Sequence, residues 1–342
     1  MNPGRTAGGR TLIGPERLRS AVTVQYRDGI EIELTDGTRV VCDADDPDGD
    51  VAVVSHAHGD HLPTGDTTAV CSDLTAAIGS RRMDGRLRAA THPRVELRPA
   101  GHVAGSRAAI VEDPNGTRYC YTGDVCTRPR FYLDGFEPPD VDVLITEATY
   151  GEPGYEFPPH GSVAGDIVEW LETTDEPVVM LGYAFGRAQK LQLLADRAGR
   201  DRVLTTDGVL RINEPIEAAL DVQFPVESFD GTELRPGDAL VLPMTSGRID
   251  WVDRLAREAG AVTAGFSGWA VEDSFMYRGD FDVTFPLSDH CDFGELLALV
   301  DGADPERVYT QHGAAASLAT ELTGRGYDAT ALREGQASLD QF

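Results

Sequence analysis

Lysine is nearly absent from this chain of 342 residues: Lys190 is the only one, and every other basic residue is arginine. Acidic residues number 57 against 30 basic ones, which gives a net charge of −27. Such a balance normally argues against a nucleic-acid partner, because Lys and Arg bind phosphates. The acidic residues are spread along the chain, however, as on surfaces adapted to high salt, where charge repulsion is screened within a few ångströms. We therefore give the net charge little weight against a polyanionic substrate.

Long apolar runs and paired cysteines are also missing. No run approaches the ~20 apolar residues that span a bilayer, and residues 1–20 lack the apolar core of a signal peptide. We expect residues 1–20 to be a flexible tail, no membrane partner, and a cytoplasmic protein. The cysteines are odd in number and form no Cys-x-x-Cys pair, so we expect free thiols in a reducing compartment. They are Cys42, Cys71, Cys120, Cys126 and Cys291.

Four side chains able to bind metal follow one short strand. The apolar, β-branched run 51–54 predicts a buried strand. Directly after it come His56, His58, Asp60 and His61. In an extended segment His56 and His58 project to the same side, and the turn that Gly59 permits can bring Asp60 and His61 to an adjacent position. Imidazole and carboxylate suit zinc and similar first-row metals, and two such pairs can serve two ions.

This run resembles the metal-binding loop of the metallo-β-lactamase fold. The resemblance implies an α/β protein, an αββα sandwich with a one- or two-metal hydrolytic site at one edge. The preceding segment predicts an antiparallel meander with strands at 22–26, 30–34 and 38–42. Asp43 ends the third strand, and we expect it to orient the metal loop. A solvated turn is the alternative for any one acid in this region.

Later motifs follow in the order that this family implies. His102 lies in a glycine-flanked loop between predicted strands, and Asp124 follows the predicted strand 118–121. Glu147 ends the apolar run 143–146 and begins the sequence Glu-Ala-Thr-Tyr-Gly. With His290 and His312 after a long insertion, the pattern resembles the β-CASP branch of the superfamily, the nucleases of DNA repair and RNA processing. The resemblance covers residues 20–335.

The resemblance also implies a ligand set. One metal takes His56, His58, His102 and Asp124, and the second takes Asp60, His61, Asp124 and His312. Zinc is the first choice for the two divalent ions, and manganese is the alternative. The implied catalytic residues are Asp60, His290, Glu147 and Asp43. Two ions activate a hydroxide, His290 protonates the leaving oxygen and Glu147 orients His290 or holds it protonated; a neutral structural His290 is the alternative.

The insertion predicts a small α/β cap with a parallel sheet. We divide the chain into a metallo-β-lactamase part over 21–151, a β-CASP-like cap over 152–280 and a return to the first domain over 281–342. Within the cap we expect Ser162 to cap a helix over 163–171, and His160 to be a surface histidine. Strand, glycine turn and helix at 178–194 resemble the Gly-Arg-Ala-Gln element of such caps and suggest an anion site, with a solvated helix face as the alternative. The candidate phosphate-binding residues are Arg187, Lys190, Ser246, Arg248 and Ser267.

The implied function is metal-dependent phosphodiester hydrolysis of nucleic acid. We expect a DNA exonuclease of repair, most like the ligase-associated DNA exonucleases, with an RNA-processing nuclease of the mRNA 3′-end type as the alternative. DNA ranks ahead of RNA as substrate, although His312 is the residue usual in the RNA-processing enzymes. A small-molecule hydrolase and an inactive scaffold subunit rank lower. As protein partners we consider a second copy of the chain or a repair or processing complex.

Overall fold

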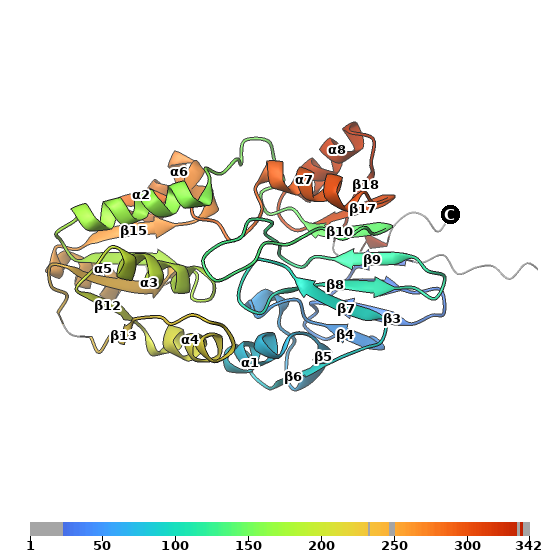
Figure 1. The fold of residues 1–342 in the computed structure, drawn as a ribbon, viewed down its shortest axis with the longest axis horizontal. Coiled ribbons are helices and arrows are strands. Elements are labelled where there is room, and N and C mark those ends of the chain that lie inside the picture. Colours follow the sequence, from blue (N-terminus) through green and yellow to red (C-terminus); the bar gives the residue numbers. More distant parts are fainter. Residues whose placement is uncertain (1–22, 232, 246–249, 334–335, 338–342) are drawn as a thin grey trace, which may run out of the picture.

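The computed structural model describes residues 23–231, 233–245, 250–333 and 336–337. In Figure 1 the first and last parts of the chain lie together on the right, and the middle part forms a separate lobe on the left. This arrangement matches an insertion between two parts of one sandwich domain. Within the described residues no helix is long and apolar enough to cross a membrane.

The sandwich domain contains two sheets. The first has the order β19-β1-β2-β3-β4-β5-β6 and the second β18-β17-β10-β9-β8-β7. The strands of the first are β1 (Thr23–Tyr26), β2 (Ile30–Glu33), β3 (Arg39–Cys42), β4 (Val51–Val53), β5 (Thr67–Val70), β6 (Leu87–Ala90) and β19 (Gln336–Ala337). Those of the second are β7 (Val95–Pro99), β8 (Arg107–Glu112), β9 (Arg118–Tyr121), β10 (Val143–Glu147), β17 (Arg307–Gln311) and β18 (Asp328–Ala331). The antiparallel meander predicted for β1, β2 and β3 is confirmed.

Alternating side chains of one strand serve two different cores. In β10, Val143 and Ile145 pack between the two sheets, whereas Leu144 packs against the helices that cover the second sheet. This is the period of two expected for a strand buried on both faces. The covering helices are α7 (Phe293–Ala303) and α8 (Ala315–Gly324), and α1 (Asp73–Arg82) covers the first sheet. The layers are therefore helix, sheet, sheet and helix, the αββα sandwich that the sequence predicted.

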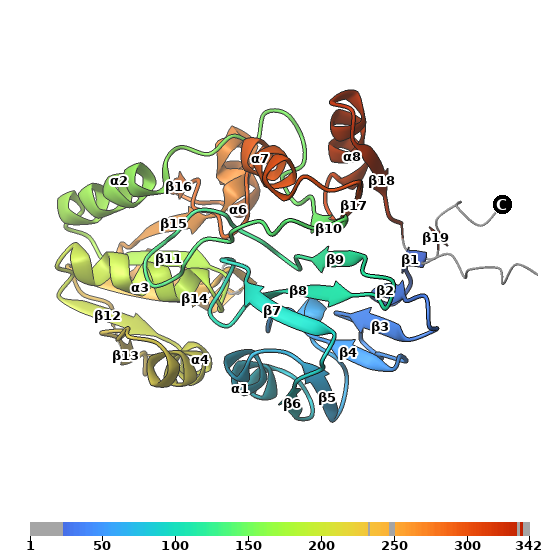
Figure 2. The ribbon, with the colours of Figure 1, turned by 45° about the vertical axis from the view of Figure 1, so that its right-hand side comes forward.

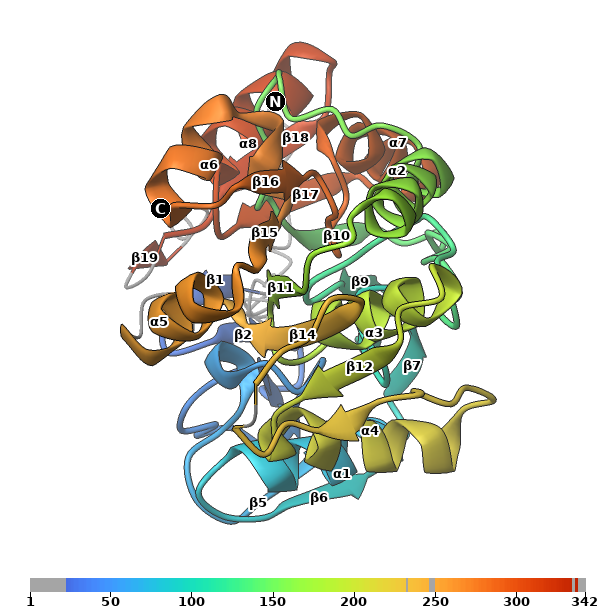
Figure 3. The same ribbon diagram turned by 90° about the vertical axis from the view of Figure 1, so that its left-hand side faces the viewer.

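The inserted lobe is built on one parallel sheet of order β13-β12-β14-β11-β15-β16. Its strands are β11 (Val178–Gly182), β12 (Arg202–Thr205), β13 (Glu227–Ser228), β14 (Asp238–Pro243), β15 (Val262–Phe266) and β16 (Val283–Phe285). Its helices are α2 (His160–Thr173), α3 (Arg187–Arg197), α4 (Asp207–Ala219), α5 (Asp250–Ala259) and α6 (Asp273–Gly279). In Figure 3, α2 and α3 lie on one side of this sheet and α5 and α6 on the other. β16 lies beyond residue 280, the end of the cap predicted from the sequence.

The two lobes meet along a shared apolar cluster. Helix α4 of the cap lies beside α1 of the sandwich domain, as Figures 2 and 3 show. Ile212 and Ile216 of α4 pack in one cluster with Leu74 and Ile78 of α1. Phe185, in the loop before α3, belongs to the same cluster. The packing fixes this loop of the cap against the edge of the sandwich where the histidine run begins.

Two predictions about the start of the cap were wrong. Helix α2 begins at His160 and is preceded by Pro159 at the N-cap, so Ser162 lies within the first turn and is not the cap. His160 is not a surface histidine either, because its Nε2 atom is buried and its ring contacts Phe131 at a centroid distance of 5.2 Å.

Candidate metal centre

Strand direction gathers the predicted ligands at one edge of the sandwich. β9, β10 and β17 run parallel to one another, so their carboxyl ends lie at the same edge. Asp124 follows β9, Glu147 ends β10 and His312 follows β17. β4 of the facing sheet leads to His56 at the same edge.

Three imidazoles and one carboxylate converge within this edge. The potential ligand atoms of His56, His58, His102 and Asp124 all lie within 4.8 Å of one another. Nδ1 of His58 is 3.0 Å from Nε2 of His56 and 3.2 Å from Nε2 of His102. Oδ2 of Asp124 is 3.5 Å from Nε2 of both His56 and His102. A ring of three imidazole nitrogens and a carboxylate fits a first-row divalent cation.

The protonation states favour such a cation. Burial and the neighbouring histidines lower the pKa values of His56 and His102 well below the usual range. Burial also lowers the pKa of His58, to about 4. Neutral imidazole is the form that binds metal. Burial raises the pKa of Asp124, despite the opposing charge of His61, and a bound cation would favour its ionised form.

Asp43 lies behind this ring and contacts the loop that carries it. Its Oδ2 atom is 2.8 Å from Nδ1 of His61 and accepts a hydrogen bond of 2.8 Å from the hydroxyl of Tyr121. Its Oδ1 atom accepts a hydrogen bond of 2.7 Å from the backbone N–H of Ser55. Burial alone would lower the pKa of His61, but the charges of Asp124 and Asp43 raise it to about 10. Asp43 is therefore positioned to hold the ring of His61 through Nδ1, which leaves Nε2 facing Asp124.

The second predicted ligand set is drawn together less tightly. Nε2 of His61 lies 3.7 Å from Oδ2 of Asp124 and 3.8 Å from Oδ2 of Asp60, whose side chain is 81% exposed. The ring of His312 is exposed, with its centroid 6.0 Å from that of His61. These four side chains border one region of the edge, beside the first ring.

His290 and Glu147 form a pair next to the ring. Nδ1 of His290 lies 2.7 Å from Oε1 of Glu147, and the His290 ring centroid lies 4.5 Å from that of His102. Glu147 is buried, and its two oxygens also accept hydrogen bonds of 3.1 Å from the backbone N–H groups of Val125 and Thr149. Burial alone would lower the pKa of His290, but the charges of Glu147 and Asp124 raise it to about 9. The imidazole is therefore set up to carry a proton at neutral pH, with its Nε2 atom free of the Glu147 contact.

Two of the candidate phosphate-binding residues are used elsewhere. Arg187 and Lys190 are 1% and 0% exposed, and both pair with the carboxylate of Asp289. The Arg187 distance is 2.8 Å, and Arg130 approaches the same carboxylate at 3.9 Å. The prediction that Arg187 and Lys190 contact substrate was wrong, and so was the solvated-face alternative, because the pair is enclosed between cap and sandwich.

The buried ion cluster reaches the metal ring through one carbonyl. The backbone oxygen of Asp289 lies 2.9 Å from Nδ1 of His102 and accepts a hydrogen bond of 3.1 Å from Arg130. Contacts of this kind fix the tautomer of a ligating histidine. Sequence reasoning missed Asp289 and Arg130. Asp289 precedes His290 directly, and that adjacency was the available signal.

Of the other cap candidates, the structure describes only Ser267. Ser267 is buried, and its hydroxyl accepts a hydrogen bond of 3.3 Å from the backbone N–H of Trp269. Its assignment to phosphate stays a prediction. Ser246 and Arg248 lie outside the described residues.

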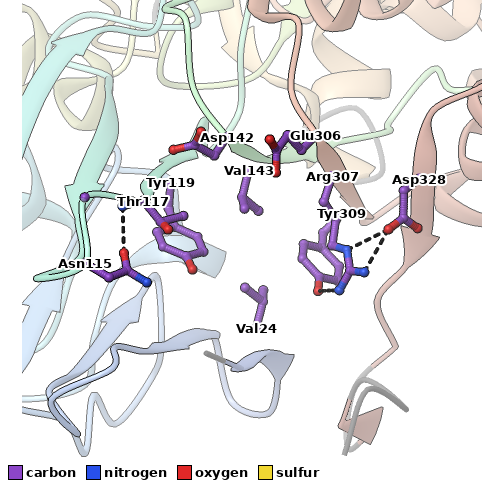
Figure 4. Close-up of a pocket in the computed structure, with 11 residues that line it drawn as sticks. Val24, Asn115, Thr117, Tyr119, Asp142, Val143, Glu306, Arg307, Tyr309 and Asp328 are labelled. Atoms are coloured by element: carbon purple, nitrogen blue, oxygen red, sulfur yellow. Dashed lines mark hydrogen bonds and ion pairs between the residues drawn. The ribbon is translucent and has the colours of Figure 1, made fainter. Parts of the chain in front are cut away.

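A cavity lies at the other ends of β9 and β10, away from the metal ring. It has a volume of about 580 Å³ and is lined by Val24, Tyr119, Val143 and Tyr309, among others (Figure 4). Tyr119 and Val143 lie near the starts of β9 and β10, so the cavity is separated from the metal ring by the length of those strands. None of the predicted site residues lines it.

No family model matches the sequence. Several known proteins are similar to it. A probable DNA ligase of Opitutus terrae is 33% identical over 297 residues, which is 82% of this chain and 28% of that protein. An RNase J-like protein of Methanocaldococcus jannaschii is 34% identical over 32% of this chain and 28% of its own length. The probable RNase MJ4 of the same organism is 22% identical over 70% of this chain and 67% of its own length.

The chain thus spans under a third of the length of the first two of these relatives. Among solved structures, a protein of unknown function from Enterococcus faecalis aligns with a TM-score of 0.64 and 13% identity. The alignment covers 92% of this chain and 99% of that one. This likeness concerns the fold alone.

Proposed function

Because the chain belongs to the metallo-β-lactamase superfamily, in its β-CASP branch, we propose that it hydrolyses phosphodiester bonds of nucleic acid at the metal centre. The observation that carries the proposal is the Glu147–His290 pair, with 2.7 Å between Oε1 and Nδ1, beside the ring formed by His56, His58, His102 and Asp124. One ring can hold a cation, and a proton donor stands next to it.

Our proposal assigns the ring residues to a first divalent ion. Asp60, His61, Asp124 and His312 are assigned to a second ion. When bound, two such ions supply an activated water and offset the charge that develops on the phosphate. Zinc remains the first choice and manganese the alternative.

The remaining steps belong to the side chains. His290 gives a proton from Nε2 to the leaving oxygen, and Glu147 stabilises the imidazolium and holds the ring in place through Nδ1. Asp43 holds His61 in the orientation that directs its Nε2 atom toward Asp124. Asp60 and His312 are the exposed members of the set, and we assign them to the side from which substrate enters.

We propose DNA as the substrate and exonucleolytic repair as the role. Of the three sequence relatives described above, the one that matches the largest part of this chain, 82%, is named a probable DNA ligase. The alternative is RNA, which the names of the two Methanocaldococcus jannaschii relatives favour. A second copy of the chain or a repair or processing complex remains the proposed protein partner.

A substrate panel tests the proposal. End-labelled single- and double-stranded DNA and RNA of one sequence are incubated with the protein in molar salt, with Zn²⁺ or Mn²⁺. We expect cleavage of DNA that chelator removes and that His290→Ala slows. Preferential cleavage of RNA would replace DNA with the alternative. Hydrolysis of small esters or lactams without cleavage of any strand would overturn the nuclease assignment.

A further inference from the structure

A cavity lined by three arginines opens between the two lobes. It has a volume of about 290 Å³ and lies where α1 of the sandwich meets α4 of the cap. Arg81 and Arg82 come from the end of α1, and Arg211 comes from α4. Two lobes thus contribute cations to one space in a chain whose net charge is −27.

These cations are poorly neutralised by the protein itself. Arg81 has a long surface contact, 3.8 Å, with Glu214. Among the described residues, neither Arg82 nor Arg211 has a carboxylate within 4.0 Å. Nε of Arg82 is buried and has no hydrogen-bond partner in the part of the chain that the structure describes. A buried donor without a partner has an unfavourable free energy that a bound anion would remove.

Helix α4 adds donors to the same space. Its N-cap residue, Thr206, and its second residue, Gly208, both line the cavity. The Thr206 side chain makes no capping hydrogen bond. The first turn of a helix presents N–H groups and a partial positive charge, which suit a phosphate. The same turn of α4 also carries the carboxylate of Asp207, which accepts a hydrogen bond of 2.6 Å from Ser228. A guanidinium binds phosphate through parallel N–H donors. The arginines and the start of α4 therefore both favour a phosphate group as the ligand of this cavity.

The arginine cavity, defined by Arg81, Arg82, Arg211 and the start of α4, adjoins the metal ring. The Arg82 guanidinium lies 5.6 Å from the ring centroid of Phe185. Phe185 in turn contacts His58, with 5.3 Å between ring centroids and 3.2 Å between its carbonyl oxygen and Nε2 of His58. One side chain therefore separates the cavity from a predicted ligand.

An exposed aromatic ring lies close to the metal ring and next in sequence to a residue that lines the cavity. Tyr183 is 53% exposed, its ring centroid is 6.4 Å from that of His58, and its chain neighbour Ala184 lines the cavity. The Arg187 guanidinium lies 5.3 Å from the centroid of the Tyr183 ring and supports it from within the cap. Exposed aromatic rings beside arginines are the usual platform on which single-stranded bases stack.

We propose that the arginine cavity binds backbone phosphates of the substrate strand next to the bond that is cleaved, while Tyr183 stacks on a base between the cavity and the metal ring. The inference rests on the proposed function and adds to it the path of the strand across the two lobes. It also replaces the phosphate site predicted from the sequence at Arg187 and Lys190.

The experiment measures binding apart from cleavage. The affinity for a fluorescently labelled single-stranded oligodeoxynucleotide with a nuclease-resistant phosphorothioate backbone is measured by anisotropy, over a range of chloride concentrations. Arg82→Gln, Arg211→Gln and the double variant are compared with Arg325→Gln, which removes the same charge from the end of α8, on the far side of the sandwich domain.

We expect each cavity variant to weaken binding about tenfold, since each removes a charge-assisted hydrogen bond to a phosphate. The slope of log affinity against log salt should fall by about 0.7 for each phosphate of a single strand that the variant no longer neutralises. Arg325→Gln should leave both quantities unchanged. If Arg82→Gln unfolds because it loses its packing on Phe185, the exposed Arg211 decides the matter alone.

Two failures are distinguishable. If the unmodified protein cleaves an ordinary phosphodiester strand of the same sequence, and both cavity variants bind the phosphorothioate strand like Arg325→Gln, the cavity assignment is overturned and the nuclease assignment stands. If the unmodified protein neither binds nor cleaves any strand, both assignments fail.

Discussion

Glu147 and His290 are 143 positions apart in the sequence, yet Oε1 of the one lies 2.7 Å from Nδ1 of the other. Glu147 ends a central strand of the second sheet, and His290 lies in the loop by which the chain returns from the cap. The contact therefore joins two segments that are close only after the cap has folded between them. It leaves the other nitrogen of His290 available beside the metal ring.

If His290 donates a proton to the leaving oxygen, His290→Ala should lower turnover of an oligonucleotide by ~10²–10⁴, the usual effect of losing a general acid. The same variant should lose less of its turnover of a p-nitrophenyl phosphodiester, because that leaving group is acidic and departs without being protonated. Metal content should be unchanged, and His92→Ala, outside every site motif, serves as the control. An equal loss on both substrates would contradict proton donation, and a loss of metal would make His290 a ligand.

The Glu147 carboxylate raises the pKa of His290 against the effect of burial. A donor is active below its pKa, so turnover should fall as the pH rises through that value. Glu147→Gln removes the negative charge and should move this alkaline limb to lower pH, without changing the acidic limb. The measurement is the pH profile of kcat for both proteins. Superimposable profiles would mean that Glu147 only supports the strand end.

His58 lies between two other predicted ligands, with Nδ1 3.0 Å from His56 and 3.2 Å from His102. His58→Ala should therefore empty the first site and leave the second. On the two-metal assignment, the unmodified protein should contain about two metal ions per chain and His58→Ala about one. Elemental analysis of both proteins, purified without chelator, measures this content. His92→Ala should keep the full content. Less than one ion per chain in active unmodified protein would contradict the two-metal assignment.

Two members of the metal ring could be predicted from local sequence alone, whereas His102 and Asp124 lie far along the chain from them. His56 and His58 are two residues apart at a strand end, and the period of a strand alone puts them on one side. Several strands of both sheets were also readable, since short apolar runs between turn residues mark them, whereas β5, β6 and β18 were not predicted. The positions of Asp124 and Glu147 were predictable only through their order in a known family.

The buried ion cluster could not be predicted in the same way. Lys and Arg are rarely fully buried, so Arg187 and Lys190 on a helix suggested a surface. Their partner, Asp289, is about a hundred residues away, and no periodicity reports such a pairing. The arginine cavity has the same origin, because Arg82 and Arg211 meet only where two helices of different lobes pack.

The net charge of −27 predicts a stability that depends on salt. Repulsion between surface carboxylates reaches about 10 Å at 0.1 M salt but only about 3 Å at 1 M. The melting temperature should therefore rise between dilute buffer and molar chloride. Chloride is preferred to sulfate, which strengthens apolar burial by exclusion from the surface. Equal melting temperatures in both conditions would refute adaptation to high salt and would count against a polyanionic substrate.

Asp289 is the only carboxylate that faces Lys190, Arg187 and Arg130 within 4.0 Å among the described residues. Asp289→Asn should therefore leave three buried cations without a counter-charge and destabilise the protein by ~3–5 kcal/mol, the usual effect of breaking a buried pair. Glu321→Gln is the matched control, because its partner Arg325 lies 3.0 Å away on an exposed helix face. An exposed pair of that spacing contributes about 0.3–0.5 kcal/mol. Urea unfolding in molar salt compares the two variants, and the salt suppresses the general repulsion of the acidic surface. If Asp289→Asn loses no more stability than Glu321→Gln, the three buried cations do not need the charge of Asp289.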